Sequence, residues 1–183
     1  KKINFFILIF SFFILGQSLF AEEFNISADE INIDKENEIL IGTGSVKAID
    51  AEGKVITANK IIYKKNDEFL SAEGEVVIQD LEGNILKAEK ATYDKLNELI
   101  TTYQRTELIL NEGYNLLGKN IFYDTQRKLL SSDKKSVFID NEGNSINTEM
   151  FQYNLNDNLF SSVGKIKIKD INKNKYFFKE LYI

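Results

Sequence analysis

The chain has 183 residues, of which 43% are hydrophobic and 28% are charged, and its formal net charge is −5. This composition is typical of a globular domain and excludes the strongly basic surface of a nucleic-acid-binding protein. Histidine, cysteine, proline and tryptophan are absent. Because the usual general base, the thiol nucleophile and the commonest metal ligand are all missing, we expect neither an enzyme nor a bound metal or cofactor.

Residues 1–21 predict a secretory signal peptide. Lys1 and Lys2 precede an apolar run over residues 3–15, and Ala21 stands before two glutamates. The apolar run is too short to favour a membrane-spanning helix, which needs about 20 residues. An uncleaved anchor is the alternative, because Leu19 is not the small residue preferred three positions before a cleavage site. We expect cleavage after Ala21 and a mature domain over residues 22–183 that works outside the cytoplasm.

A fixed spacing runs through the rest of the chain. Turn-like x-x-Glu-Gly segments end at Gly53, Gly83, Gly113 and Gly143, one every 30 residues. When the chain is cut after each of these glycines, the third position of each piece is aliphatic. The fifth position is small, and the tenth is isoleucine or tyrosine. Self-similarity at this period indicates a repeat architecture, in which each unit buries its apolar face against its neighbours.

Each 30-residue unit predicts two β-strands. Segments such as 54–63 and 73–80 are rich in β-branched residues, alternate in polarity and end in turn residues. The x-x-Glu-Gly segment fits a type I turn closed by a left-handed glycine, and polar segments such as 64–68 fit the other hairpin ends. Five units and one further strand give about eleven strands. The predicted fold class is therefore all-β, an antiparallel β-jellyroll or folded-sheet solenoid of 30-residue two-strand repeats.

The apolar pattern predicts a corner in each strand. Apolar positions run Ile56, Ala58, Ile61 and Tyr63, whereas strict alternation would have placed one at Lys60. The pleat therefore slips once between Ala58 and Ile61, as it does at a β-bulge. Glycines of the following or preceding strand fall opposite this slip: Gly42, Gly44, Gly74 and Gly164. Stacked corners would fold the sheet into a V or jellyroll section with apolar side chains inside.

A recurring motif accompanies the predicted corner. It consists of a small residue with an acidic or amide residue, an aliphatic or tyrosine residue a few positions later, and a Gly-x-Val strand. The examples are Ala28-Asp29 with Ile33, Ala58-Asn59 with Tyr63, Ala88-Glu89 with Tyr93, Gly44-Ser45-Val46 and Gly74-Glu75-Val76. In these residues the chain resembles the OstA-like periplasmic β-jellyroll of the lipopolysaccharide transport (Lpt) family. The resemblance covers residues 24–183 and is strongest at the start. Later, Gln104 and Lys134 replace the corner glycine, and Gly118-Lys119 and Thr148-Glu149 replace the Ala-Asp pair.

The resemblance implies a role in lipopolysaccharide transport and outer-membrane assembly in a Gram-negative cell. In this family, jellyrolls join end to end between the two membranes and pass lipopolysaccharide along an apolar groove. The expected location is the periplasm, in association with the outer membrane. The expected partners are lipopolysaccharide and other Lpt jellyrolls, added strand to strand and head to tail; no nucleic acid is expected. The signal peptide and the unfinished last strand favour the N-terminal domain of the outer-membrane translocon, with its barrel or lipoprotein plug as a further partner, over a free bridge protein.

The candidate site is the inward apolar face of the folded sheet. The predicted groove-lining residues are Ile26, Ala28, Ile31, Ile33, Leu40, Val46, Ile56, Ala58, Ile61, Tyr63, Leu70, Val76, Leu86, Ala88, Tyr93, Leu116, Ile121, Tyr123, Phe138, Ile146 and Tyr153. The edge-strand residues predicted to join neighbouring jellyrolls are Phe24, Asn25, Ile26, Ser27, Tyr176, Phe177 and Phe178. Without the resemblance, an apolar stripe is more often a closed core. The rival interpretation is a structural β-solenoid scaffold that assembles through its edge strands and carries no lipid.

Overall fold

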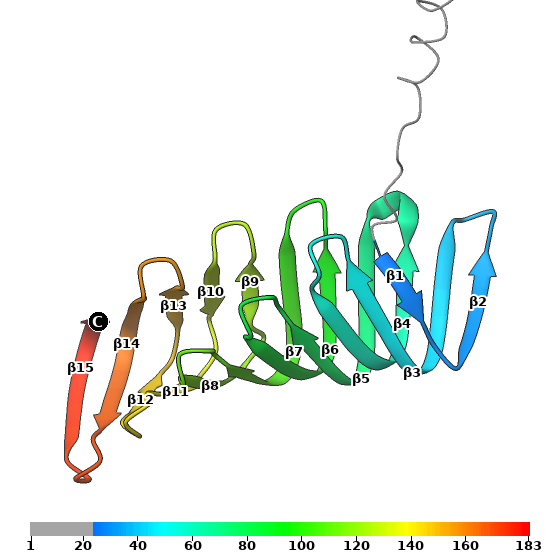
Figure 1. Ribbon diagram of the computed structural model, residues 1–183. Coiled ribbons are helices and arrows are strands. Elements are labelled where there is room, and N and C mark those ends of the chain that lie inside the picture. The colour runs from blue at the N-terminus through cyan, green and yellow to red at the C-terminus, as the bar shows by residue number, and fades with distance from the viewer. Residues whose placement is uncertain (1–23) are drawn as a thin grey trace, which may run out of the picture.

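A computed structural model describes residues 24–183; the predicted signal peptide lies outside the described residues. The described chain forms one 15-stranded antiparallel sheet and a short 3-10 turn at Lys65–Asp67 (Figure 1). The strands are β1 Phe24–Ser27, β2 Glu30–Asp34, β3 Ile39–Asp50, β4 Val55–Lys64, β5 Phe69–Gln79, β6 Ile85–Asp94, β7 Leu99–Ile109, β8 Asn115–Lys119, β9 Phe122–Asp124, β10 Leu129–Ser132, β11 Ser136–Ile139, β12 Ser145–Thr148, β13 Phe151–Asn154, β14 Leu159–Lys169 and β15 Lys175–Tyr182. Within residues 24–183, none of the helical structure is long and apolar enough to cross a membrane.

The chain crosses the sheet eleven times, as the expected number of about eleven strands predicts, but some of these passes are divided, so the number of strand segments is larger. Seven passes are single strands, whereas four passes are each split into two segments: β1 and β2, β8 and β9, β10 and β11, and β12 and β13. The splits occur where the sheet bends, because the interstrand hydrogen bonds are interrupted at that point. The all-β jellyroll is therefore observed, and the solenoid description of the 30-residue period stays a prediction.

The predicted corner is confirmed by the strand register. The β3–β4 ladder shifts between Thr43 and Val46, and the β4–β5 ladder shifts between Thr57 and Lys60. Gly74 in β5 has a φ of +76°, and a Cβ atom there would lie 2.8 Å from the amide nitrogen of the Asn59 side chain. The two parts of the sequence motif, Ala-Asn and Gly-x-Val, are thus opposite sides of one corner, where glycine is needed for both conformation and space.

Corners that lack glycine are held by other hydrogen bonds. Gln104 has a left-handed φ of +62°; its backbone amide donates to Asn120 Oδ1 at 2.9 Å, and the Asn120 amide donates to the Gln104 carbonyl at 3.1 Å. Nearby, the Ser132 hydroxyl donates to the Lys119 carbonyl at 2.7 Å. Six buried hydroxyl residues lie in this part of the fold: Thr102, Thr106, Ser132, Ser136, Thr148 and Ser162. Their hydroxyls bond one another or backbone groups at the places where the ladder is interrupted.

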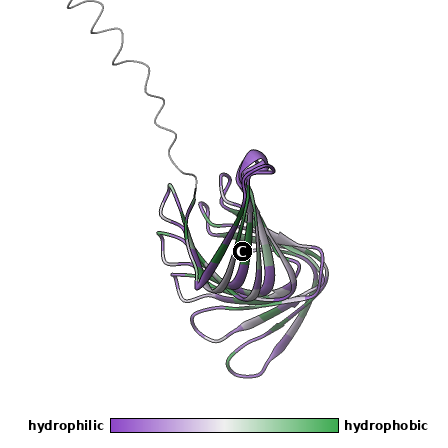
Figure 2. Cartoon of the chain, turned by 90° about the vertical axis from the view of Figure 1, so that its right-hand side faces the viewer, coloured by the Kyte–Doolittle hydropathy of each residue, from purple (hydrophilic) through white to green (hydrophobic). Residues whose placement is uncertain are grey.

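The hairpin turns form two rows, one at the end of each arm of the folded sheet (Figures 1 and 2). We call residues 50–53, 80–83, 110–113 and 140–143 the Glu-Gly lip, and residues 34–38, 64–68, 94–98, 124–128 and 154–158 the opposite lip. In the Glu-Gly lip, the Gly83 amide donates to the Asp80 carbonyl at 3.2 Å, and Gly83 has a φ of +88°. This agrees with the predicted turn closed by a left-handed glycine.

The core fills the space between the two arms. Viewed along the stack of strands, the sheet folds back on itself (Figure 2). The side chains on its inner face are buried. Near the lips, the Phe24 ring makes edge contacts with Tyr63 and Tyr93 at centroid distances of 5.0 and 6.0 Å. At the other end, Phe138 packs on Phe160 at 5.1 Å. The middle of the fold is therefore a packed interior, and any space for a ligand lies toward its ends.

Candidate functional site

The predicted groove-lining residues separate into three groups in the structure. Fifteen of them belong to the buried core: Val46, Ile56, Ala58, Ile61, Tyr63, Leu70, Val76, Leu86, Tyr93, Leu116, Ile121, Tyr123, Phe138, Ile146 and Tyr153. Ile26, Ala28, Leu40 and Ala88 are partly buried. Ile31 and Ile33 on β2 are exposed, at 43% and 58%. The structure therefore brings these residues to one interior, which is closed over most of its length and accessible at its first strands.

An apolar pocket of about 350 Å³ opens at the N-terminal end of the interior. Its apolar lining includes Phe24 and Ile26 of β1 together with Ile33, Leu40 and Tyr63. Asp34, Lys35, Glu38 and Lys65 surround the pocket near the opposite lip. An apolar floor with charged groups at its rim suits a molecule with hydrocarbon and polar parts, and the volume lies within the range of ligand pockets.

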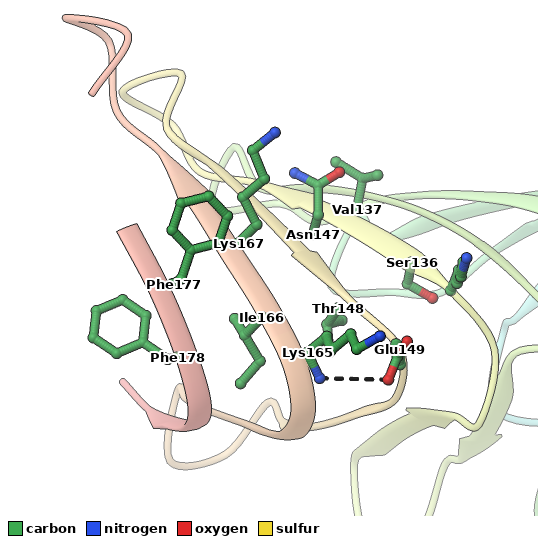
Figure 3. A pocket seen from close by; sticks show the side chains of 11 residues that line it. Ser136, Val137, Asn147, Thr148, Glu149, Lys165, Ile166, Lys167, Phe177 and Phe178 are labelled. Carbon is green, nitrogen blue, oxygen red and sulfur yellow. Dashed lines mark hydrogen bonds between the residues drawn. The ribbon is translucent and has the colours of Figure 1, made fainter. Parts of the chain in front are cut away.

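The C-terminal end also exposes apolar side chains. Tyr176 and Phe178 of β15 pair with Ile168 and Ile166 of β14 and are 45% and 44% exposed. A cavity of about 620 Å³ lies beside them, lined by Lys135, Ser136, Val137, Asn147, Thr148, Glu149, Lys165, Ile166, Lys167, Phe177 and Phe178 (Figure 3). Four of these eleven lining residues are apolar or aromatic, against six of the ten that line the N-terminal pocket, so the N-terminal pocket is the better candidate for a hydrocarbon chain.

Side chains of the two lips meet over the middle of the interior. Lys95 of the opposite lip pairs with Glu52 of the Glu-Gly lip at 2.5 Å, and also with Glu98 at 2.6 Å. Glu82, one period after Glu52, pairs with Lys128 at 2.7 Å. These contacts join residues that are 43 and 46 positions apart in the chain. The mouth between the lips is therefore bridged by charge.

A tyrosine beneath the first bridge extends the network. The buried Tyr93 hydroxyl donates to Glu98 Oε2 at 2.9 Å, and Lys54 Nζ donates to the Tyr93 hydroxyl at 2.8 Å. Lys54 also lies 4.3 Å from the centre of the Tyr93 ring and pairs with the buried Asp50 carboxylate at 3.0 Å. Lys54 thus links the start of β4 to the end of β6 across the mouth.

The pKa values in this network follow from burial and from the ion pairs. Burial raises the pKa of Tyr93 well above its usual value, and the hydrogen bond to Glu98 adds to the effect. Burial alone would raise the pKa of Glu98, but hydrogen bonds from Lys95, Thr125 and Tyr93 lower it to about 2. Burial alone would lower the pKa of Lys95, yet Glu52 and Glu98 hold it above its usual range. Glu98 and Lys95 are therefore charged at neutral pH.

No group of three or more His, Cys, Asp or Glu residues within 24–183 is placed to hold a metal ion. The carboxylates of Glu52, Glu82 and Glu98 are engaged with lysines at the mouth of the interior. What the arrangement offers is an apolar interior, an open pocket at one end and a charged closure over the middle.

Two sets of residues escaped the sequence analysis. The bridging charges are absent from the predicted site because their segments predict only hairpin turns: Glu52, Glu82, Lys95 and Lys128. The recurrence of glutamate before each turn glycine was a signal for them. The buried corner hydroxyls were also missed, although Thr102, Ser132 and Ser162 share the 30-residue spacing.

The predicted assembly residues lie on the two edges of the sheet. β1 and β2 pair only with β3 among the described strands, and β15 pairs only with β14. Asn25 and Ser27 are exposed, Ile26 is partly buried, and Phe177 is 72% exposed. The Phe24 side chain lies in the core, so only the backbone of this residue could contact a strand of a neighbouring jellyroll.

No protein-family model and no curated protein matches the chain. Among solved structures, it is similar to LptH from Pseudomonas aeruginosa, described as the LptA-homologous periplasmic component of the lipopolysaccharide transport device. The TM-score is 0.52 and the identity 19%, over 58% of this chain and 79% of the LptH chain. The TCP10 domain of Danio rerio CPAP also aligns, with a TM-score of 0.16 and 12% identity, over 85% of this chain and 99% of that one. The chain thus has the β-jellyroll fold of an Lpt component.

Proposed function

We propose that this protein is a non-enzymatic carrier that binds the acyl chains of lipopolysaccharide in its apolar interior and passes the lipid across the periplasm. The observation that carries the proposal is the pocket at the N-terminal end, whose apolar walls continue into the buried interior. Burial of each methylene group contributes about 0.8 kcal/mol, so an apolar channel can hold a lipid without any catalytic group. The fold shared with LptH supports the same role.

A specific observation favours the scaffold as the second candidate. The inward side chains from β4 to β14 are packed, with Ile61, Tyr93 and Ile121 fully buried. A scaffold needs only such a core and two edges, whereas a carrier must admit lipid between the arms. The two functions therefore differ in whether a lipid reaches the inward face of the first strands.

Photo-crosslinking at neighbouring positions of β2 tests the proposal. Ile31 and Ile33 face the interior end, whereas Asn32 stands between them on the alternate face. A benzophenone amino acid at residue 31 or 33 is expected to capture lipopolysaccharide, and the same group at residue 32 is expected to capture little. All three positions are exposed, so the substitutions leave the packed core intact. Equal capture at the three positions, or none, would favour the scaffold.

The finer assignment within the family is also a proposal. We infer a periplasmic location in association with the outer membrane, with other Lpt jellyrolls as partners. We retain the N-terminal jellyroll of the outer-membrane translocon LptD as the preferred form, and the bridge protein LptA as the alternative. The sequence after Ile183 in the intact gene separates them, because a translocon requires many further strands of about 10 residues, each alternating in polarity.

A further inference from the structure

We propose that the lip-to-lip ion pairs Glu52–Lys95 and Glu82–Lys128 form a latch that closes the middle of the interior and must open to admit a lipid chain from the side. The inference rests on the proposed function, because it concerns how the same interior is reached. The charged side chains concerned lie on hairpin turns, where such side chains usually point into solvent.

The geometry shows that each pair crosses the mouth. Glu52 follows β3 and Lys95 follows β6, so the 2.5 Å contact connects the ends of the two arms. Glu82 follows β5 and Lys128 precedes β10, and their contact at 2.7 Å makes the same connection farther along the stack. The two glutamates are one 30-residue period apart. The two lysines are 33 positions apart, so they come from different positions of their turns, and what the two contacts share is the glutamate position and the crossing from one lip to the other.

The burial of the lysines distinguishes this closure from ordinary surface pairs. The Lys95 side chain is 12% exposed and lies 5.7 Å from the centre of the Tyr93 ring, so its stem covers the core from above. Lys128 is 29% exposed. In contrast, the Glu73–Lys90 pair, at 2.6 Å between β5 and β6, lies on one arm with both side chains 45% exposed. It provides a matched control with the same chemistry and no role at the mouth.

The latch covers only part of the mouth. One period after Glu82, Glu112 lies close enough to Tyr153 to contribute, after burial, to raising the pKa of that phenol to about 12. In the described residues, no ion pair bridges the mouth at Glu112; the Tyr153 hydroxyl donates instead to Asn158 at 2.6 Å. At the other end lies the open pocket beside Phe24 and Ile33. The closed section therefore has an open pocket on its N-terminal side and a part of the mouth without an ion pair on its C-terminal side.

The first experiment measures opening without any lipid. Because the chain contains no cysteine, Ala91→Cys places a single thiol in the core, where Ala91 is 1% exposed. Its labelling by a maleimide reports the opening of the arms. Charge reversal by Glu52→Lys with Glu82→Lys should accelerate labelling about ten-fold, the change that corresponds to about 1.4 kcal/mol over two pairs. Glu73→Lys should leave the labelling rate unchanged.

The second experiment measures uptake of fluorescent lipopolysaccharide. Cysteines at residues 52 and 95, joined by a reducible bifunctional reagent, should slow uptake at least several-fold, and a reductant should restore it. The same reagent across residues 73 and 90 should have no effect. If charge reversal accelerates maleimide labelling but no variant takes up lipopolysaccharide, the latch is supported and the carrier function is rejected. A different outcome would reject the latch alone. In that case the wild type takes up lipopolysaccharide, charge reversal does not change the labelling rate, and the crosslink between residues 52 and 95 does not slow uptake.

Discussion

At the scale of single residues, glycines at the corners and glycines at the turns differ in the space around them. Gly74 at a corner and Gly83 at a turn both have positive φ, of +76° and +88°. A Cβ atom at Gly74 would lie 2.8 Å from the amide nitrogen of Asn59, whereas at Gly83 the nearest atom would be 3.7 Å away, in Asn111. The two glycines are therefore required for different reasons, one for conformation and space and the other for conformation alone.

Substitution of these two glycines should separate the two costs. Gly83→Ala is expected to lower the free energy of unfolding by about 1 kcal/mol, because alanine is strained at positive φ. Gly74→Ala carries the same strain and a clash with Asn59, so its loss should be larger by about 1–2 kcal/mol. Urea unfolding of both variants measures the difference. A second substitution, Asn59→Ala, should recover part of the loss at residue 74, and equal losses at 74 and 83 would contradict a steric role for the corner.

At the scale of elements, the sheet has two edge strands that differ in what they expose. β2 is exposed along its whole length, and β15 presents Tyr176, Phe177 and Phe178 with an apolar exposed surface. Backbone groups on such edges recruit further strands unless the edge is protected, and the chain has no proline to protect either one. Strand addition would extend the interior of one jellyroll into the next.

Head-to-tail joining predicts a specific crosslink between molecules. Ser27 and Phe177 occupy the same place in their 30-residue units, at opposite edges of the sheet. When a Ser27→Cys variant is mixed with a Phe177→Cys variant, oxidation should give disulfide-linked pairs that increase with protein concentration. A Ser27→Cys variant mixed with Glu73→Cys is the control, because Glu73 lies on an inner strand. Equal crosslinking in both mixtures would show that the edges are not the joint.

At the scale of the whole molecule, one interior runs through the stack and its closure depends on charge. Lys95 connects Glu52 on one lip with Glu98 on its own lip, and Glu98 also accepts from Tyr93 and Thr125. The two arms are therefore in contact through the core between them and through this network at their lips. Conditions that neutralise the glutamates should weaken the closure and with it the stability of the fold.

Acid should destabilise the protein through Glu98. Its pKa is about 2 in the folded state against an ordinary value of 4.5, so the stabilisation is present above about pH 4.5 and is lost as the pH falls toward 2. Urea unfolding at pH 7 and pH 3 should show Glu98→Gln less stable than wild type at pH 7, by the order of 2 kcal/mol, and closer to it at pH 3. A constant difference between the two proteins at both pH values would show that Glu98 does not carry this pH dependence.

The sequence by itself determined the all-β class, the turn positions and the corners, because these depend on local patterns. Alternation assigns the two faces of a strand, the slip between Ala58 and Ile61 marks the bend, and Gly83 closes its own turn. The inward direction of most predicted site residues followed from the same pattern. Only the tertiary structure decided which of them are accessible, because exposure depends on position along the stack: Ile33 is open at the end, whereas Ile61 is enclosed. It also decided that Glu52 meets Lys95, because folding at the corner brings together turns that are 43 residues apart.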